Sequence, residues 1–203
     1  MNEKKSLKNK KLMLTGAAGN LGEHYIDILV DLGVTVIAVD LERNKNKLYK
    51  IAEKYKTNDS NEKVIVKEAD ISEKENVEKL FSNIEKSYGA IDILVNNASY
   101  SQTKHIDKGS VQTFENFSDE IWKETLKVNL NGAFYCCQEA GKQMLKNGKG
   151  VILNISSVYG VVAADQRIYG DSGLNSNIAY AVSKAALINM SRYLASYWQG
   201  KNI

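Results

Sequence analysis

Short apolar runs alternate with amphipathic stretches along the whole chain. The runs at 11–15, 34–40, 64–68, 91–96 and 150–156 are brief and mostly rich in β-branched residues, which predicts strands. The stretches at 21–32, 48–55, 72–88, 118–147 and 178–198 carry apolar residues at helical spacing. Strand–helix units repeated in this order form a doubly wound parallel sheet, because their crossovers are right-handed. The pattern therefore predicts an α/β fold in three layers and one domain.

One helix start carries a specific signal. Ser72 is followed three residues later by Glu75, which predicts a capping box at the start of the helix 72–88. The strand at 34–40 is apolar almost throughout, which is typical of a parallel strand covered on both faces.

Two polar segments, 99–116 and 158–177, are longer than ordinary connections in such a fold. Each follows a predicted strand, so both leave from the carboxyl edge of the sheet. Ligands of open α/β sheets bind at this edge. We therefore expect the functional site there.

Composition narrows the class of protein. The chain has 203 residues, of which 43% are apolar and 25% charged, and this suits one globular domain. Five Lys among the first eleven residues are expected to be a solvated terminus, neither a nucleic-acid arm nor a secretory signal. No apolar run is long enough to span a membrane. Cys136 and Cys137 are adjacent and cannot form a disulfide framework, so a reducing, cytoplasmic setting is expected. No metal site is expected.

A glycine-rich turn joins the first strand to the first helix. It reads Thr-Gly-Ala-Ala-Gly-Asn-Leu-Gly over 15–22. Such a turn lets the backbone approach a pyrophosphate, and the helix start offers free N–H groups to the anion. The candidate cofactor-binding residues of the turn are Gly16, Gly19, Asn20, Leu21 and Gly22.

Asp40 ends the second strand, where a carboxylate holds the ribose hydroxyls of a dinucleotide. This favours NAD, whereas a 2′-phosphate would be repelled. Arg43 lies three residues on and leaves NADP open. The plainer alternative is that Asp40 is a turn residue. Asp70 and the Asn96-Asn97-Ala98 run lie on the same edge of the predicted sheet, although each also suits a helix start or a simple turn.

The last predicted helix carries Tyr180 and Lys184 four positions apart, hence on one face. An ammonium beside a phenol stabilises the phenolate, which can then exchange a proton with a substrate oxygen. Ser156 and Ser157 end the fifth strand and are expected to face the same cleft.

Taken together, these motifs resemble the short-chain dehydrogenase/reductase family over nearly the whole chain. The order is the glycine turn, Asp40, Asp70, Asn-Asn-Ala, Asn129 in Val-Asn-Leu-Asn-Gly, Ser157, then Tyr180 and Lys184. The resemblance implies a Rossmann fold and hydride transfer between a nicotinamide and a carbonyl or alcohol.

The resemblance also implies roles for single residues. Tyr180 would be the acid/base, and Lys184 would assist it and hold the nicotinamide ribose. Ser157 would bind the substrate oxygen, and Asn129 would kink its helix and hold a water on the proton path. Other residues would line or support the cofactor: Asp70 and Ile71 at the adenine, Asn97 and Ala98 beside the turn, and Asn96 in the sheet.

Three features depart from the family pattern. The glycine spacing is that of the branch with nucleotide-sugar epimerases. Ser157 and Tyr180 are 23 positions apart, more than usual, and the extra segment contains Gln166, Arg167, Tyr169 and Asp171, which suit a sugar or sugar phosphate. With the long 99–116 segment, this resembles oxidoreductases of bacterial surface-sugar and flagellin modification.

The third departure is the end of the chain at Ile203, where family members continue into further strands and a substrate lid. We expect a truncated chain with an exposed sheet edge. The alternatives to a sugar-directed oxidoreductase are a non-catalytic NAD(H)-binding module and a nucleotide-sugar epimerase or dehydratase. The family implies a homodimer or homotetramer. An apolar stripe suits either its interface or the core: Ala133, Phe134, Cys137, Ala140 and Met144.

Overall fold

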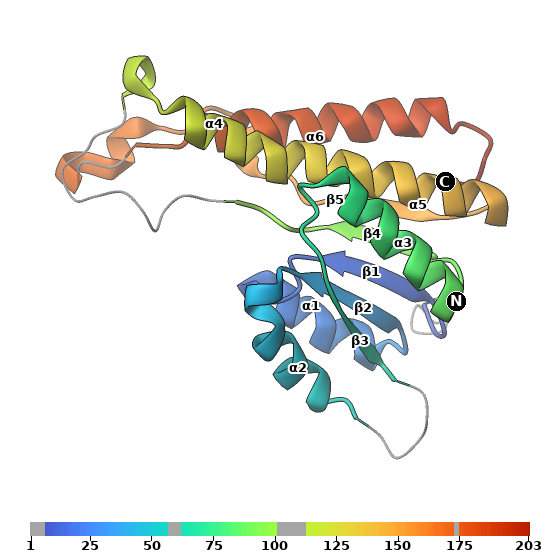
Figure 1. Cartoon of the computed structure of the whole chain (residues 1–203). Helices are drawn as coiled ribbons and strands as arrows, with labels where there is room; N and C mark the ends of the chain where they lie inside the picture. Colours follow the sequence, from blue (N-terminus) through green and yellow to red (C-terminus); the bar gives the residue numbers. More distant parts are fainter. Residues whose placement is uncertain (1–6, 57–61, 101–112, 173–174) are drawn as a thin grey trace.

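A computed structural model describes residues 7–56, 62–100, 113–172 and 175–203 of the chain (Figure 1). Five parallel strands form one sheet in the order β3-β2-β1-β4-β5. The strands are β1 (Lys11–Thr15), β2 (Thr35–Asp40), β3 (Val64–Glu68), β4 (Ile93–Asn96) and β5 (Val151–Asn154). The strand order reverses between β1 and β4, so the expected doubly wound topology is confirmed.

Helices cover both faces of this sheet. They are α1 (Asn20–Asp31), α2 (Lys45–Glu53), α3 (Lys74–Tyr88), α4 (Asp119–Leu126), α5 (Ala133–Asn147) and α6 (Ile178–Tyr197). Figure 1 shows α1 and α2 below the sheet, with α3, α4, α5 and α6 above it. The three-layer α/β/α arrangement follows from this placement.

Each face of the sheet has its own apolar core, because alternate side chains of a strand point to opposite faces. Leu12 and Leu14 of β1 pack toward α1 and α2 with Ile26. Met13 lies between them and packs toward α3 and α5, against Phe81. Both faces are covered, and this explains why the strands are apolar at nearly every position.

The stripe on α5 belongs to the second of these cores. Cys137, Ala140 and Met144 are buried in the core, and Ala133 is buried beside them. Phe134 is the exception, with 44% of its surface exposed. The stripe is therefore chiefly intramolecular.

Two predicted helix starts were wrong. The helix expected from Leu48 begins at Lys45, since a 3-10 turn at Glu42–Asn44 leads directly into it. The helix expected from Ser72 begins at Lys74, and its cap residue Glu73 makes no side-chain capping bond. Asp70 Oδ1 accepts a hydrogen bond from Ser72 N at 2.9 Å, so a side-chain turn takes the place of the predicted capping box.

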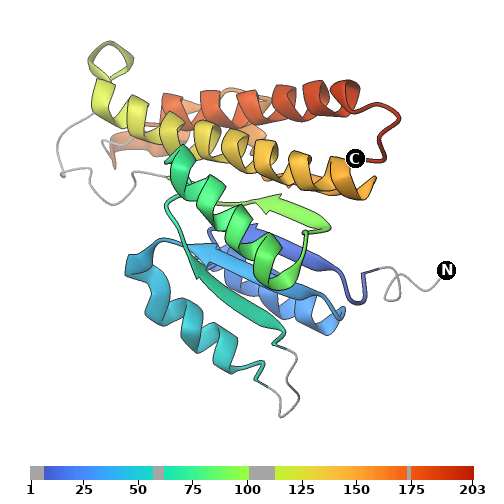
Figure 2. The same cartoon turned by 45° about the vertical axis from the view of Figure 1, so that its right-hand side comes forward.

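The helix predicted over 118–147 is interrupted by a π-helical turn at Lys127–Gly132, between α4 and α5. The turn contains Asn129, the residue expected to kink this helix. Single π turns often mark functional sites. Figure 2 shows α4 and α5 as one continuous rod that lies beside α6.

Strand β5 lies at an edge of the sheet. Val151 and Leu153, which point to the same face of this strand, are 51% and 45% exposed. The edge strand thus leaves one apolar face uncovered. Most of the long 99–116 segment lies outside the described residues.

Candidate active site

The glycine turn lies at the carboxyl end of β1 and is packed tightly against the end of β4. Gly16 has φ of +67°, and a Cβ there would lie 2.7 Å from Ala98 Cα. A Cβ on Gly22 would lie 2.5 Å from Gly16 O, so only glycine lets α1 start this close to the turn. Gly19 is the extended cap residue of α1, and Asn20 and Leu21 form its first exposed turn.

Asn97 fixes the same turn from β4. Its Nδ2 donates to Thr15 O and Gly16 O, each at 3.1 Å. The backbone N–H groups of Asn97 and Ala98 both donate to Thr15 Oγ1 at 3.1 Å. Thr15 is fully buried and was not singled out from the sequence. The side chain that ends β1 thus joins the carboxyl ends of β1 and β4 beside the glycine turn.

Asp40 is tied to the glycine turn as well. Its Oδ2 accepts from Ala18 N at 2.9 Å. Its Oδ1 accepts from Leu41 N at 2.8 Å and from Asn44 Nδ2 at 2.7 Å. Arg43 is exposed in the following 3-10 turn. The carboxylate is thus held at one place beside the turn.

Asp70 and Ile71 differ in burial and in the contacts of their side chains. Asp70 is exposed, and its carboxylate accepts the N–H of Ser72. Ile71 is buried and packs against the π turn, where a Cβ on Gly132 would lie 3.0 Å from its side chain. The side chain of Ile71 contributes chiefly to packing, which sequence motifs alone do not reveal.

Tyr180 and Lys184 lie on one face of α6, as predicted. Asn177 Oδ1 caps this helix by accepting from Tyr180 N at 3.0 Å. Lys184 is only 3% exposed. Its Nζ lies 5.5 Å from the centroid of the Tyr180 ring. The same atom donates a hydrogen bond to Ile155 O at 2.7 Å. Burial lowers the pKa of Lys184 below its ordinary value. The ammonium is thus fixed between the end of β5 and the phenol.

Asn129 connects the π turn to two other elements. Its Oδ1 accepts from Tyr100 N at 2.6 Å, and its Nδ2 donates to Tyr100 O at 3.3 Å and to Ser183 Oγ at 3.2 Å. Ser183 Oγ in turn donates to Tyr180 O at 2.7 Å. The segment after Ala98 is therefore bonded through Asn129 and Ser183 to the helix that carries Tyr180.

The two serines after β5 have different partners. Ser156 Oγ donates to Lys184 O at 2.7 Å, which fastens this segment to α6. Ser157 Oγ accepts from Tyr159 N at 3.2 Å and caps a short 3-10 turn. Gly160 closes that turn, and a Cβ there would lie 2.8 Å from the backbone of Lys184. The sequence analysis singled out neither Gly160, three positions after Ser157, nor Ser183, which lies between Tyr180 and Lys184.

Asn96 is buried in the sheet, as the resemblance implied. Its Nδ2 donates to Asn154 Oδ1 at 2.8 Å. Asn154 Nδ2 then donates to Ser191 Oγ of α6 at 2.9 Å. This polar link joins β4, β5 and α6 below the candidate site.

Two of the extra residues before α6, Arg167 and Gln166, have partners close by in the sequence. Arg167 pairs with Asp165 at 2.7 Å, and 91% of its side chain is exposed. Gln166 is held by its bond from Ser176 N, at 2.9 Å. Both side chains are thus bonded within the segment that leads to α6.

Comparison with known proteins places these features in a family. Residues 10–203 match the model for short chain dehydrogenases. The NAD-dependent glycerol dehydrogenase of Listeria innocua is 29% identical over 98% of this chain and 68% of its own length. The 3-oxoacyl-[acyl-carrier-protein] reductase of Thermotoga maritima is 31% identical over 97% of this chain and 71% of its own length.

A solved structure is also similar. The short chain dehydrogenase of Leptospira borgpetersenii with bound NAD+ has a TM-score of 0.79 and 29% identity, over 100% of this chain and 71% of its own. This chain thus spans about two thirds of the length of such relatives. Across the described residues, the helices are all too short or too polar to cross a bilayer. With a family match over residues 10–203, the chain is a member of the short-chain dehydrogenases/reductases, a family of NAD(P)-dependent oxidoreductases.

Proposed function

We propose that this protein transfers a hydride between NAD and an alcohol or carbonyl carbon of a polyol or sugar-like substrate. The observation that carries the proposal is the fixed pair of Tyr180 and Lys184, joined through Ser183 and Asn129 to the segment that follows β4. The glycerol dehydrogenase relative supports the substrate class.

The residues at the carboxyl edge fit a dinucleotide. The start of α1 and the glycine turn would take the pyrophosphate. Asp40 would bind the adenosine ribose, since a carboxylate has about four acceptor positions and the three hydrogen bonds that it accepts from Ala18, Leu41 and Asn44 leave one for a ribose hydroxyl. The negative charge disfavours NADP. Asp70, Ile71, Asn97 and Ala98 would border the adenine and ribose groups.

Tyr180 and Lys184 would act at the reacting carbon. When bound, the nicotinamide supplies or accepts the hydride. Tyr180 Oη takes the hydroxyl proton of the substrate in oxidation and returns it to the carbonyl oxygen in reduction. Lys184 stabilises the phenolate through its charge and holds the nicotinamide ribose, because Ile155 O and burial fix its position.

Ser157 and Asn129 complete the proposed catalytic set. Ser157 lies in the turn that packs on α6, and its hydroxyl would hydrogen-bond the substrate oxygen. Asn129 would hold a water on the proton path from the π turn. The buried contact of Asn129 with Ser183 keeps that turn in register with α6.

The proposal extends to domain organisation, oligomeric state and compartment. The chain would act as one domain over 1–203, in a homodimer or homotetramer. The two cysteines are free and buried, which suits the reducing conditions of the cytoplasm.

The test begins with the purified chain, NAD+ and a panel of neutral polyols, with NADH followed by absorbance and NAD+ binding by calorimetry. The proposal predicts NAD+ binding and NADH formation with at least one polyol. NAD+ binding without turnover on any substrate would favour the dinucleotide-binding module instead. Absence of dinucleotide binding would reject both.

A further inference from the structure

The proposed acid/base lies in the first turn of its helix. α6 begins at Ile178, so Tyr180 is its third residue, whereas Lys184 lies one turn further along. The first N–H groups of a helix have no partner within the helix, and helix ends fray. The position of the phenol therefore depends on the contacts that hold this turn.

The second turn of α6 is anchored separately. Lys184 is buried, and its Nζ donates to Ile155 O at 2.7 Å. Its backbone carbonyl accepts from Ser156 Oγ, also at 2.7 Å. Both contacts join Lys184 to the segment that ends β5, so the ammonium does not depend on the first turn for its place.

The chain before α6 is largely exposed. Residues 166–172 form an irregular 3-10 segment, and most of them are exposed. Figure 1 shows this segment projecting beyond the sheet before the chain enters α6. Exposed residues of this kind contribute little packing that could hold the start of the next helix.

Asn177 caps the helix at the backbone of the phenol-bearing residue. Its Oδ1 accepts from Tyr180 N at 3.0 Å, and its carbonyl accepts from Ala181 N at 3.2 Å. On the other side, Ser183 Oγ donates to Tyr180 O at 2.7 Å. Side chains thus hold both the N–H and the carbonyl of Tyr180, and Asn177 supplies the contact nearest the exposed segment.

We propose that Asn177 is a positioning residue for the proposed acid/base, because its cap on Tyr180 N keeps the phenol ring beside the Lys184 ammonium. The inference rests on the proposed function and adds a residue to it. Asn177 acts through the backbone of Tyr180 and needs no contact with substrate or cofactor.

The variant Asn177→Ala removes the cap. We expect kcat to fall about fivefold, equivalent to about 1 kcal/mol and typical of such a cap, because the phenol spends less time in the reactive position. NAD+ affinity, measured by calorimetry, should not change, because other contacts hold the glycine turn and Lys184. Asn177→Ser keeps a capping oxygen and should recover most of the wild-type kcat.

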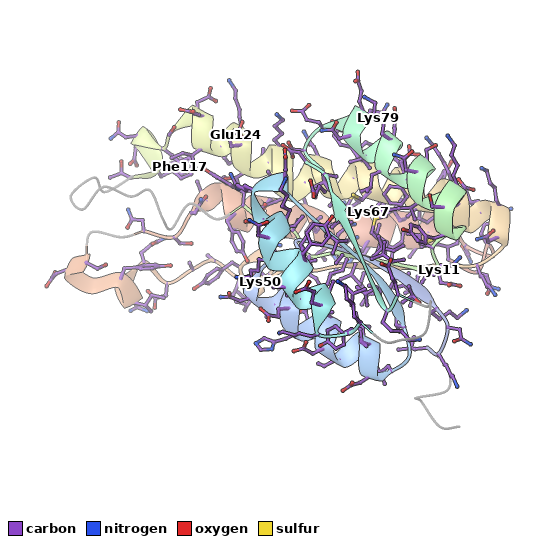
Figure 3. The ribbon with its side chains drawn as sticks, turned by 60° about the horizontal axis from the view of Figure 1, so that its bottom comes forward. Lys11, Lys50, Lys67, Lys79, Phe117 and Glu124 are labelled. Carbon is purple, nitrogen blue, oxygen red and sulfur yellow. The ribbon has the colours of Figure 1, made fainter. Side chains whose placement is uncertain are left out.

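Ser118→Ala is the matched control. Ser118 is half-buried, as Asn177 is, and caps α4 in the same way, since its Oγ accepts from Ile121 N at 3.3 Å. Figure 3 labels Phe117 and Glu124 near the two ends of α4; Ser118 directly follows Phe117, at the end away from the π turn. This variant should lose a similar free energy of unfolding in urea and keep the wild-type kcat.

Amide exchange followed by NMR gives a second measurement, which needs no substrate. Asn177→Ala should speed the exchange of the Tyr180 N–H at least about fivefold, because its hydrogen bond is lost. The exchange of the Leu187 N–H, deeper in α6, should not change.

A wild-type kcat in Asn177→Ala would overturn the inference, as would an equal loss of kcat in Ser118→Ala or a failure of Asn177→Ser to recover activity. An unchanged exchange rate at the Tyr180 N–H would also overturn it. Absence of NADH formation by the wild-type protein would reject the proposed function and the inference with it. The two failures are distinguishable, because that result is obtained from the wild-type protein alone.

Discussion

Asn129 Nδ2 donates to Ser183 Oγ at 3.2 Å, and this buried bond couples the π-helical turn to the helix that carries Tyr180 and Lys184. The same amide also bonds the backbone N–H and the backbone carbonyl of Tyr100, so it connects the π turn, the segment after β4 and α6. Ser183 extends this network within α6, because its hydroxyl donates to Tyr180 O.

Replacing Ser183 by Ala should therefore weaken both the fold and the activity. It leaves the buried Asn129 amide without one acceptor, which costs about 1–3 kcal/mol of unfolding free energy. We expect kcat to fall with little change in NAD+ affinity. Urea denaturation measures the loss of stability, turnover assays measure kcat, and calorimetry measures NAD+ affinity. Ser196→Ala, at an exposed position of the same helix, is the control. Equal stability and turnover in the two variants would show that this contact carries no weight.

Gly16 should tolerate no side chain. Gly16→Ala adds the strain of a positive φ, about 1 kcal/mol, and a collision with the backbone of Ala98. Gly148→Ala is the matched control, because its φ of +68° is nearly the same and a Cβ there meets nothing within 4 Å. The first variant should lose clearly more unfolding free energy, and it should also lose NAD+ affinity. Similar losses in thermal or urea unfolding would contradict the close packing of the turn.

Asp40 should set the choice of cofactor. Asp40→Asn removes the charge that would repel a 2′-phosphate and keeps most of the shape of the side chain. We expect the ratio of NAD+ to NADP+ affinity to fall by about tenfold, equivalent to about 1.4 kcal/mol. Calorimetric titration of both dinucleotides measures the ratio. An unchanged ratio would mean that Asp40 serves the turn alone, through its bonds to Ala18 and Asn44.

Tyr55 gives the fold a defined pH dependence. Burial and its hydrogen bond to Asp27 raise the pKa of Tyr55 to about 12. A group with a raised pKa stabilises the fold below its unfolded pKa of about 10, and this contribution is lost as pH rises toward about 12. Tyr55→Phe should therefore cost about 1 kcal/mol near neutral pH and less at about pH 11. Urea unfolding at both pH values tests this, with Tyr49→Phe on exposed α2 surface as the control. A cost that does not shrink with rising pH would contradict the assigned contact.

A doubly wound parallel sheet could be predicted from the sequence because apolar periodicity is set by burial, and burial on both faces is the main constraint on Met13 and its neighbours. The prediction failed at Ser72, because Asp70 and Ser72, two positions apart, could each organise the turn. The Asp70 carboxylate accepts the N–H of Ser72, and the helix begins two residues later, at Lys74.

The candidate site was predicted as separate motifs, and their connections were not. Thr15, Gly160 and Ser183 act through contacts between segments distant in sequence, which no local spacing reveals. The environment of Arg167 was also out of reach, since its pairing with Asp165 depends on the conformation of the loop. The signal that could have found Thr15 and Ser183 is that each is a small hydroxyl residue inside or next to a motif that was recognised.

The most direct test of the account replaces the proposed acid/base alone. Tyr180→Phe should reduce kcat/KM by at least about 100-fold while NAD+ still binds, because the ring remains and only the proton-carrying hydroxyl is lost. Tyr193→Phe, 64% exposed on the same helix, should keep the wild-type rate. Turnover by Tyr180→Phe at the rate of Tyr193→Phe would contradict the assignment of Tyr180.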